Sequence, residues 1–202
     1  MPLRLLNVAA LLGIPVIGLV LWAWGQPIVS TSGEIRLWVN SIWSPENSQQ
    51  VADWYTLSHM VHGLLLGLIG KTLLRRSGFA PVYLVAIATG VGWEIIEHTH
   101  WVLHRFRAVT LYQGYIGDTV LNATMDYVFM MCGFFLASRV RPWPTFGVIV
   151  AMELTSGFMA RDNLTLTTLN TLFPNPAIQA WQNAINPLSK APPPEPATAA
   201  GK

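Results

Sequence analysis

Long apolar runs separated by short polar segments restrict the fold of this chain more than any other feature of its sequence. Because about 20 residues of α-helix cross the hydrocarbon core of a bilayer, apolar runs of this length predict transmembrane helices. Only 11% of the residues are charged, whereas roughly 25% are charged in a typical soluble domain. We therefore expect an all-α polytopic transmembrane helix bundle. Its five spans are predicted at about residues 5–24, 54–74, 81–103, 118–137 and 146–160.

The segments outside these spans are shorter or more polar. Residues 163–173 and 177–185 predict interfacial helices after the last span, and residues 35–39 predict a short interfacial piece in the first loop. The Pro/Ala-rich stretch 187–202 lacks the apolar residues needed for a core and is expected to be disordered. Residues 1–186 then form one membrane domain. The first span has no clear small-residue cleavage site, which favours a retained anchor over a signal peptide.

Positive charge that no acidic residue offsets gathers on one side of the predicted bundle, although Arg105, Arg107 and Arg161 fall on the other. Three segments carry it, and none of them contains an acidic residue: Arg4, the turn with Lys71, Arg75 and Arg76, and the turn with Arg139 and Arg141. The positive-inside rule places this side in the cytoplasm. The N-terminus is then cytoplasmic, and the C-terminus lies on the opposite, periplasmic side.

Composition also excludes several classes of function. The net charge of +2 is small, and no basic stripe or known motif points to nucleic acid as a partner. The single cysteine, Cys132, excludes an internal disulfide and a cysteine-based zinc site.

Four of the predicted spans carry polar side chains at a similar depth, near the non-cytoplasmic face. These residues are His59, His62, Glu94, Glu97, His98, Asn122, Asp126 and Glu153. Spacings of three or four residues place the members of each helix on one face. A charged side chain at mid-membrane costs about 2.5–3.5 kcal/mol, so ionisable residues within spans are by default a hypothesis of function.

The chemistry of this layer allows two interpretations. In the first, His59, His62, Glu94, Glu97 and Asp126 hold a divalent metal such as zinc, and His62, Glu94, Glu97 and Asp126 are candidate catalytic groups. Two acids one helical turn apart repel when both are ionised, which favours a proton or a cation between them. In the second interpretation, the same side chains form hydrogen bonds between helices and have no chemical role.

A second group of residues lies at the outer rim of the predicted bundle. Its members are Arg105, Arg107, Asp118, Asn122, Arg161, Asp162 and Asn163. Arginines at this level bind phosphate or carboxylate groups, so the rim is a candidate site for an anionic substrate headgroup. The alternative is that these arginines extend along the interface and pair with Asp118 and Asp162. His98, His100 and His104 lead toward the same rim.

Several motifs occur in an order typical of a known family. They are Asn47-Ser48-Gln49, the segment 53–59, Trp93-Glu94-x-x-Glu97, the segments 117–122 and 161–166, and Ala180-Trp181-Gln182. Over about residues 47–182 the chain resembles an uncharacterised family of bacterial inner-membrane proteins, a domain of unknown function. The resemblance implies a bacterial inner membrane and supplies no activity. The order of His, Glu, Arg and Asp-x-x-x-Asn along the spans also resembles VanZ-like membrane proteins, which implies an envelope or lipid-linked role.

Three functions remain open from the sequence, and whether the chain is an enzyme is uncertain at this point. The first is a metal-dependent hydrolase or transferase that acts on a lipid or lipid-linked headgroup, with membrane lipids as its partners. The second is a non-catalytic accessory or assembly subunit with a membrane-protein partner. The third is a transporter or proton-conducting protein, which is disfavoured because the inner halves of the spans lack polar groups.

Overall fold

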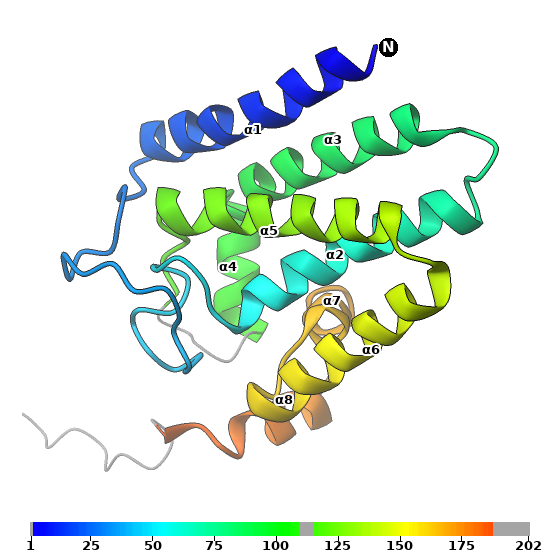
Figure 1. Cartoon of the computed structure of the whole chain (residues 1–202). Coiled ribbons are helices and arrows are strands. Elements are labelled where there is room, and N and C mark those ends of the chain that lie inside the picture. Colours follow the sequence, from blue (N-terminus) through cyan, green and yellow to red (C-terminus); the bar gives the residue numbers. More distant parts are fainter. Residues whose placement is uncertain (1, 110–114, 188–202) are drawn as a thin grey trace, which may run out of the picture.

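The computed structural model describes residues 2–109 and 115–187, and in this part of the chain the backbone forms α-helices and no strand. The helices are α1 (Leu3–Ala23), α2 (Trp54–Thr72), α3 (Phe79–Glu97), α4 (His100–Val109), α5 (Val120–Arg139), α6 (Pro142–Met159), α7 (Leu164–Leu172) and α8 (Pro176–Asn183) (Figure 1). The expectation of an all-α helix bundle is confirmed. The tail expected to be disordered, 187–202, lies outside the described residues except for Pro187.

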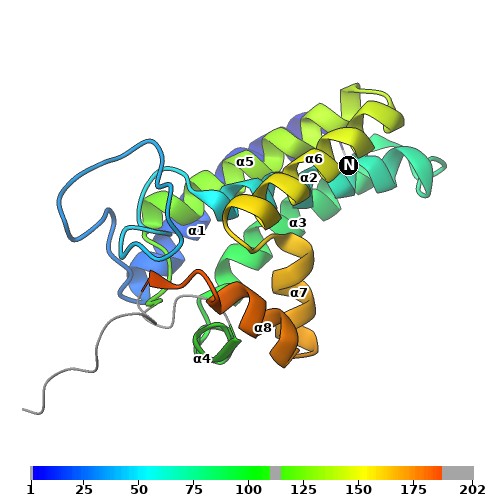
Figure 2. The same ribbon diagram turned by 90° about the horizontal axis from the view of Figure 1, so that it is seen from below.

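The long helices lie side by side and the short ones gather near one end. Helix α2 packs mainly on α5 and also on α6, whereas α1 packs on α3 and α5. Figures 1 and 2 show α4, α7 and α8 together beside the end of the bundle where α2 and α5 begin. The N-terminus, the α2–α3 turn and the α5–α6 turn lie at the opposite end (Figure 1). The bundle thus has one end with the short helices and an opposite end with the N-terminus and two tight turns.

Apolar side chains cover much of the outer surface of the long helices. Leu11 is 68% exposed, Leu154 68% and Phe158 85%, which is unusual for side chains of this size in water. Helices α1, α3 and α5 are long and apolar enough to cross a membrane, judged by length and composition. Helices α2 and α6 are not among them, and α2 carries His59, His62 and Lys71. The count of five spans therefore stays a prediction.

The third predicted span, 81–103, is too long at its end, because residues 98–103 lie outside α3. Helix α3 ends at Glu97, and α4 begins at His100 and leaves the bundle in another direction. The reason lies at His98, whose Nδ1 makes a hydrogen bond of 2.7 Å with the carbonyl oxygen of Glu94. The Nε2 atom of His98 accepts a hydrogen bond from the backbone N–H of Asp118. These bonds hold the ring of His98 in the interior and end the helix there.

Two smaller expectations also differ from the structure. Residues 35–39 form no helix; Val39 N–H donates to the carbonyl of Ala52, and Val51 N–H donates to that of Arg36, so the loop folds back on itself. Helix α6 begins at Pro142 rather than near residue 146, because proline has no N–H to lose in the first turn of a helix.

Glycines allow α2 and α5 to approach until their backbones touch. A Cβ atom added at Gly63 would collide with the carbonyl oxygen of Met130, and one added at Gly133 would collide with that of Met60. Four residues further along α2, a Cβ atom at Gly67 would collide with the Cβ of Ala137. Small residues spaced by four are the usual means of close helix packing in membranes. This contact fixes the register between α2 and α5.

We predict that Gly63→Ala lowers the stability of the protein although alanine is the better helix former. The added methyl group must push α5 away, and overpacking of this kind costs about 1–3 kcal/mol. The measurement is the thermal unfolding temperature in detergent. Gly92→Ala is the matched control, because nothing lies within 4 Å of a Cβ added there. Equal unfolding temperatures for the two variants would contradict the proposed contact.

Candidate functional site

A buried group of ionisable side chains lies at the end of the bundle where α2 and α5 begin and α3 ends. We call it the carboxylate cluster: Asp53, Glu94, Glu97, Asp118 and Asp126, together with His59 and His98. Each of the five carboxyl-bearing residues is at most 5% exposed. Buried carboxylates without compensating partners cost several kcal/mol each, so their surroundings must be accounted for in full.

The ends of the helices place these residues by local hydrogen bonds. Asp53 is the N-cap of α2: its side chain accepts from the N–H of Tyr55, and its own N–H donates to the hydroxyl of Thr56. Thr119 caps α5 in the same way by accepting from the N–H of Asn122. These caps fix where α2 and α5 start, and therefore the depth at which their polar side chains lie.

His59 lies between two carboxylates in the first half of the cluster. Its Nδ1 lies 3.2 Å from Oε1 of Glu94, and its Nε2 lies 3.8 Å from Oδ2 of Asp126. The hydroxyl of Thr56 donates to the other oxygen of Asp126 over 2.9 Å. The imidazole therefore connects α3 to α5 through α2, and it contributes at most one positive charge against two negative ones.

Glu97, His98 and Asp118 form the second half of the cluster. One possible ligand atom from each lies within 4.8 Å of the others, which is close enough to surround a metal ion. However, Nε2 of His98 accepts the N–H of Asp118 over 2.9 Å, so its lone pair is already occupied and its proton is on Nδ1. The possible metal ligands that remain here are the carboxylate oxygens of Glu97 and Asp118, which already interact with each other.

Tyr115 lies beside Asp118 and donates its hydroxyl to Oδ1 over 2.7 Å. Burial, followed by the charge of Asp118, raises the pKa of Tyr115 well above its usual value. The phenol therefore stays protonated and acts as a hydrogen-bond donor at any physiological pH.

Acidic side chains outnumber basic ones in the cluster. Among the described residues, no lysine or arginine forms an ion pair with any of its five carboxyl groups. Two buried acceptors also lack a hydrogen-bond partner there: Oε2 of Glu94 and Oδ1 of Asn122. Glu97 lies close enough to Glu94 and Asp118 for their charges to interact. The cluster therefore has too few basic side chains to pair with its carboxyl groups and too few hydrogen-bond donors to satisfy its acceptors.

The loop before α2 covers this site. Ser48 N–H donates to Asp53, Gln49 Nε2 donates to the carbonyl of Gly117, and Asn122 Nδ2 donates to the carbonyl of Gln50. Ser48 has a φ of 60°, in the left-handed region that few side chains adopt. Residues 47–50 of this loop are themselves buried, so the loop covers the cluster on this side.

The structure brings together most of the predicted layer but not all of it. His59, Glu94, Glu97, Asp118, Asn122 and Asp126 meet in the cluster. His62 is half-buried and makes no hydrogen bond or ion pair within the described part of the chain. Glu153 lies outside the cluster. Both its carboxylate oxygens accept backbone N–H groups at the start of α7.

The arginines of the predicted rim bind backbone carbonyls. Arg105 donates to Thr171 over 3.0 Å, Arg107 to Tyr115 and Arg161 to Trp181. The guanidinium of Arg161 also lies over the ring of Trp181. The predicted pairing of these arginines with Asp118 and Asp162 is not among the ion pairs of the described residues.

Asp162 and Asn163 form a separate hydrogen-bond centre at the end of α6. Asp162 accepts from the side chains of Tyr55, Thr167 and Gln182, and Asn163 caps α7. This centre ties α2, α7 and α8 together. Burial raises the pKa of Asp162 to about 6, partly offset by these hydrogen bonds.

Sequence reasoning missed Asp53, Thr56 and Tyr115 and gave His98 little weight. The spacing of Asp53 and Thr56, three residues apart at the start of an apolar run, was a usable signal of a capping box. No local pattern indicates that Tyr115 or His98 reaches the cluster, because their partner Asp118 comes from another segment.

The fold and the cluster define an all-helical protein with membrane-length apolar helices and a buried carboxylate site. The chain belongs to the family described as "Protein of unknown function (DUF2585)", which matches residues 21–184. This confirms the resemblance to an uncharacterised bacterial family.

The curated relatives extend over most of the chain. It is 38% identical over 161 residues to a UPF0314 protein of Rhizobium etli, covering 80% of this chain and 83% of that protein. It is 40% identical over 159 residues to a UPF0314 protein of Sphingopyxis alaskensis, covering 78% and 84%. No solved structure matches the chain. The resemblance to VanZ-like proteins is not supported by these matches.

We predict that the free energy of unfolding falls between about pH 4 and pH 6 because of Asp162. With a pKa of about 6 in the folded chain against 3.8 for the ordinary side chain, the native state holds this proton more tightly than the unfolded state. The contribution of Asp162 to the free energy of unfolding is therefore fully present below about pH 4 and is lost as the pH rises through about 6. The loss amounts to about 3 kcal/mol.

Asp162→Asn removes the titration while keeping an acceptor for Thr167 and Gln182. The measurement is thermal unfolding in detergent from pH 4 to pH 7.5. We expect the unfolding temperature of Asp162→Asn to rise relative to that of the wild type as the pH rises. Glu34→Gln changes an exposed ion pair, and its unfolding temperature should follow that of the wild type at every pH. Parallel curves for Asp162→Asn and wild type would contradict the prediction.

Proposed function

We propose that this chain is a bacterial inner-membrane protein that binds a divalent cation in the carboxylate cluster. The observation that carries the proposal is an excess of acidic groups: five carboxyl groups are buried together, His59 contacts only two of them, and Oε2 of Glu94 and Oδ1 of Asn122 have no hydrogen-bond donor. A divalent cation compensates for both features at once, since it neutralises two charges and binds unpaired oxygens.

The atoms available as metal ligands indicate the kind of cation. Oε2 of Glu94 and Oδ1 of Asn122 have no hydrogen-bond partner, the carboxylates of Glu97 and Asp118 supply further oxygens, and the lone pair of His98 is occupied. Oxygen donors favour magnesium, calcium or manganese over zinc, which prefers nitrogen and sulfur. We therefore propose a hard divalent ion in place of the zinc suggested by the histidines in the sequence.

The membrane orientation that we propose follows from the two ends of the bundle. The segments with Arg4, Arg75 and Arg139 lie at the end opposite the cluster (Figure 1). The positive-inside rule then gives a cytoplasmic N-terminus and puts the cluster near the periplasmic face. Five spans, formed by α1, α2, α3, α5 and α6, are part of this proposal.

The activity that we propose is hydrolysis or group transfer on a lipid or lipid-linked headgroup. The cluster lies at the end of apolar helices, at the level where headgroups meet the hydrocarbon. The cation would polarise the bond to be broken. His59, held between Glu94 and Asp126, is placed to take up and return a proton, and Arg105, Arg107 and Arg161 retain donors for an anionic headgroup. Residues 47–50 would have to move to admit the substrate.

One observation favours a second candidate, a non-catalytic accessory subunit of a membrane complex. The loop that covers the cluster is held in place by several hydrogen bonds, donated by Ser48, Gln49, Thr119 and Asn122. A cation in such a sealed site would serve to hold the helix ends together for a protein partner. The proton-conducting alternative has less support, because the other half of the bundle is filled by Tyr83, Phe134, Leu64 and similar side chains.

We predict that the purified protein retains about one divalent ion per chain, measured by elemental analysis after dialysis. Glu97→Gln and Asp118→Asn each remove a charged ligand and should lower the ion content severalfold. Glu153→Gln is the matched control, because its carboxylate caps α7 away from the cluster. Protein that neither carries nor binds magnesium, calcium, manganese or zinc would overturn the metal proposal.

The activity is tested separately, on metal-loaded protein in liposomes made from bacterial lipids. We expect release or exchange of headgroups that mass spectrometry detects, that a chelator abolishes, and that Glu94→Gln lowers at least a hundredfold. Glu153→Gln should retain it. Bound metal without turnover, together with a protein partner that co-purifies, would favour the accessory subunit instead.

A further inference from the structure

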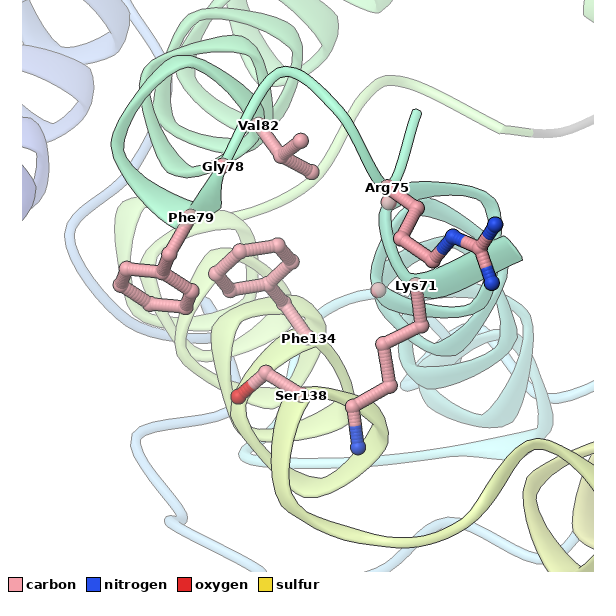
Figure 3. A pocket seen from close by; sticks show the side chains of 9 residues that line it. Lys71, Arg75, Gly78, Phe79, Val82, Phe134 and Ser138 are labelled. Atoms are coloured by element: carbon pink, nitrogen blue, oxygen red, sulfur yellow. The ribbon is translucent and has the colours of Figure 1, made fainter. Parts of the chain in front are cut away.

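The end of the bundle opposite the cluster contains a pocket that the proposed chemistry does not use. It lies between the last turn of α2, the first turn of α3 and the end of α5, and has a volume of about 270 Å³. Figure 3 shows Phe79 and Phe134 together on one side of it and Lys71 and Arg75 on the other. Gly67, Gly70 and Gly78 line it without filling it. The pocket therefore has an aromatic wall and a basic wall.

The basic wall has no negative charge to balance it. Lys71 donates one N–H to the carbonyl of Val140 over 2.6 Å, which leaves two donors. Arg75 is exposed and makes no hydrogen bond or ion pair with the described residues. The sequence contains no acidic residue from 54 to 93 or from 127 to 152, the segments that build this end. An anion is the charge that this pocket favours.

The start of α3 adds to the preference for an anion. Gly78 is its N-cap and offers no side chain to the free N–H groups of the first turn. Its φ of 77° is a conformation that glycine adopts without strain. A helix start carries partial positive charge, and here it adjoins a cavity with Lys71 and Arg75 on its wall.

The aromatic wall indicates that the ligand also has an apolar part. The rings of Phe79 and Phe134 lie 5.7 Å apart, Phe79 is 41% exposed, and the neighbouring Leu73 is 80% exposed. A volume of 270 Å³ is below the roughly 300–1,000 Å³ that encloses a drug-sized molecule. The pocket thus fits a phosphate group and the atoms next to it, with the remaining chains outside along α3.

We propose that this pocket binds an anionic phospholipid of the leaflet at the basic end of the bundle. The phosphate lies among Lys71, Arg75 and the start of α3, and the acyl chains lie against Phe79 and the apolar surface of α3. Basic pockets between transmembrane helices recognise anionic headgroups in this way. Free inorganic phosphate has no part that uses the aromatic wall. The site is independent of the carboxylate cluster at the other end.

The experiment uses the full chain in detergent and native mass spectrometry with phosphatidylglycerol or phosphatidylcholine of identical acyl chains. We expect wild-type protein to retain phosphatidylglycerol preferentially, and Lys71→Gln/Arg75→Gln to lower its affinity roughly tenfold to thirtyfold. Arg75→Gln alone breaks no hydrogen bond or ion pair with the described residues and should lower the affinity for phosphatidylglycerol severalfold. Arg76→Gln is the matched control, because it removes the same charge from the same turn outside the pocket.

Three results would overturn the proposal. They are equal retention of both lipids by the wild type, a loss with Arg76→Gln as large as with Arg75→Gln, or displacement of the lipid by an excess of inorganic phosphate. The last result would identify the site as a simple anion site. A metal-free carboxylate cluster would leave the expected lipid preference unchanged, so the two proposals fail independently.

Discussion

The backbone contact between α2 and α5 is the constraint on which the rest of the structure depends. Gly63 and Gly133 allow the two helices to touch, and neither tolerates a side chain there. His59 precedes Gly63 by four residues, and Asp126 precedes Gly133 by seven, so each polar side chain lies on the same helix face as the glycine. The close packing thus extends directly into the polar site. A bulkier residue at the contact would separate His59 from Asp126 as well as the helices.

The polar end of this contact is balanced by hydrogen bonds and not by basic residues. Caps at Asp53 and Thr119 satisfy the helix starts, and the loop at 47–50 supplies donors and acceptors from above. Oε2 of Glu94 and Oδ1 of Asn122 remain without a hydrogen-bond partner. Among the described residues, Arg36 pairs with Glu34, the three rim arginines bind backbone carbonyls, and the other lysines and arginines belong to segments at the opposite end of the bundle (Figure 1). The two proposed ligands, a cation and an anionic lipid, follow from this separation of acidic and basic groups.

Much of the site was visible in the sequence because helix spacing is regular. Residues such as Glu94 and Glu97, or Asn122 and Asp126, had to share a helix face and a depth once the apolar runs were placed. The same reasoning failed for Glu153, because depth says nothing about direction around a helix axis, and its carboxylate turns to α7. It also did not indicate the backbone carbonyls to which Arg105 and Arg161 donate, because these belong to segments that the sequence does not place near them.

The sequence by itself determined the all-helical class, the position of most helices and the grouping of polar residues near one end, because apolar length and a period of 3.6 residues are local properties. Only the tertiary structure decided that α3 ends at Glu97, since His98 is held by the backbone of Asp118, twenty residues further on. It also decided which lone pairs in the cluster are occupied and which are free. Those are properties of contacts between distant segments, and our proposal of an oxygen-bound cation depends on them.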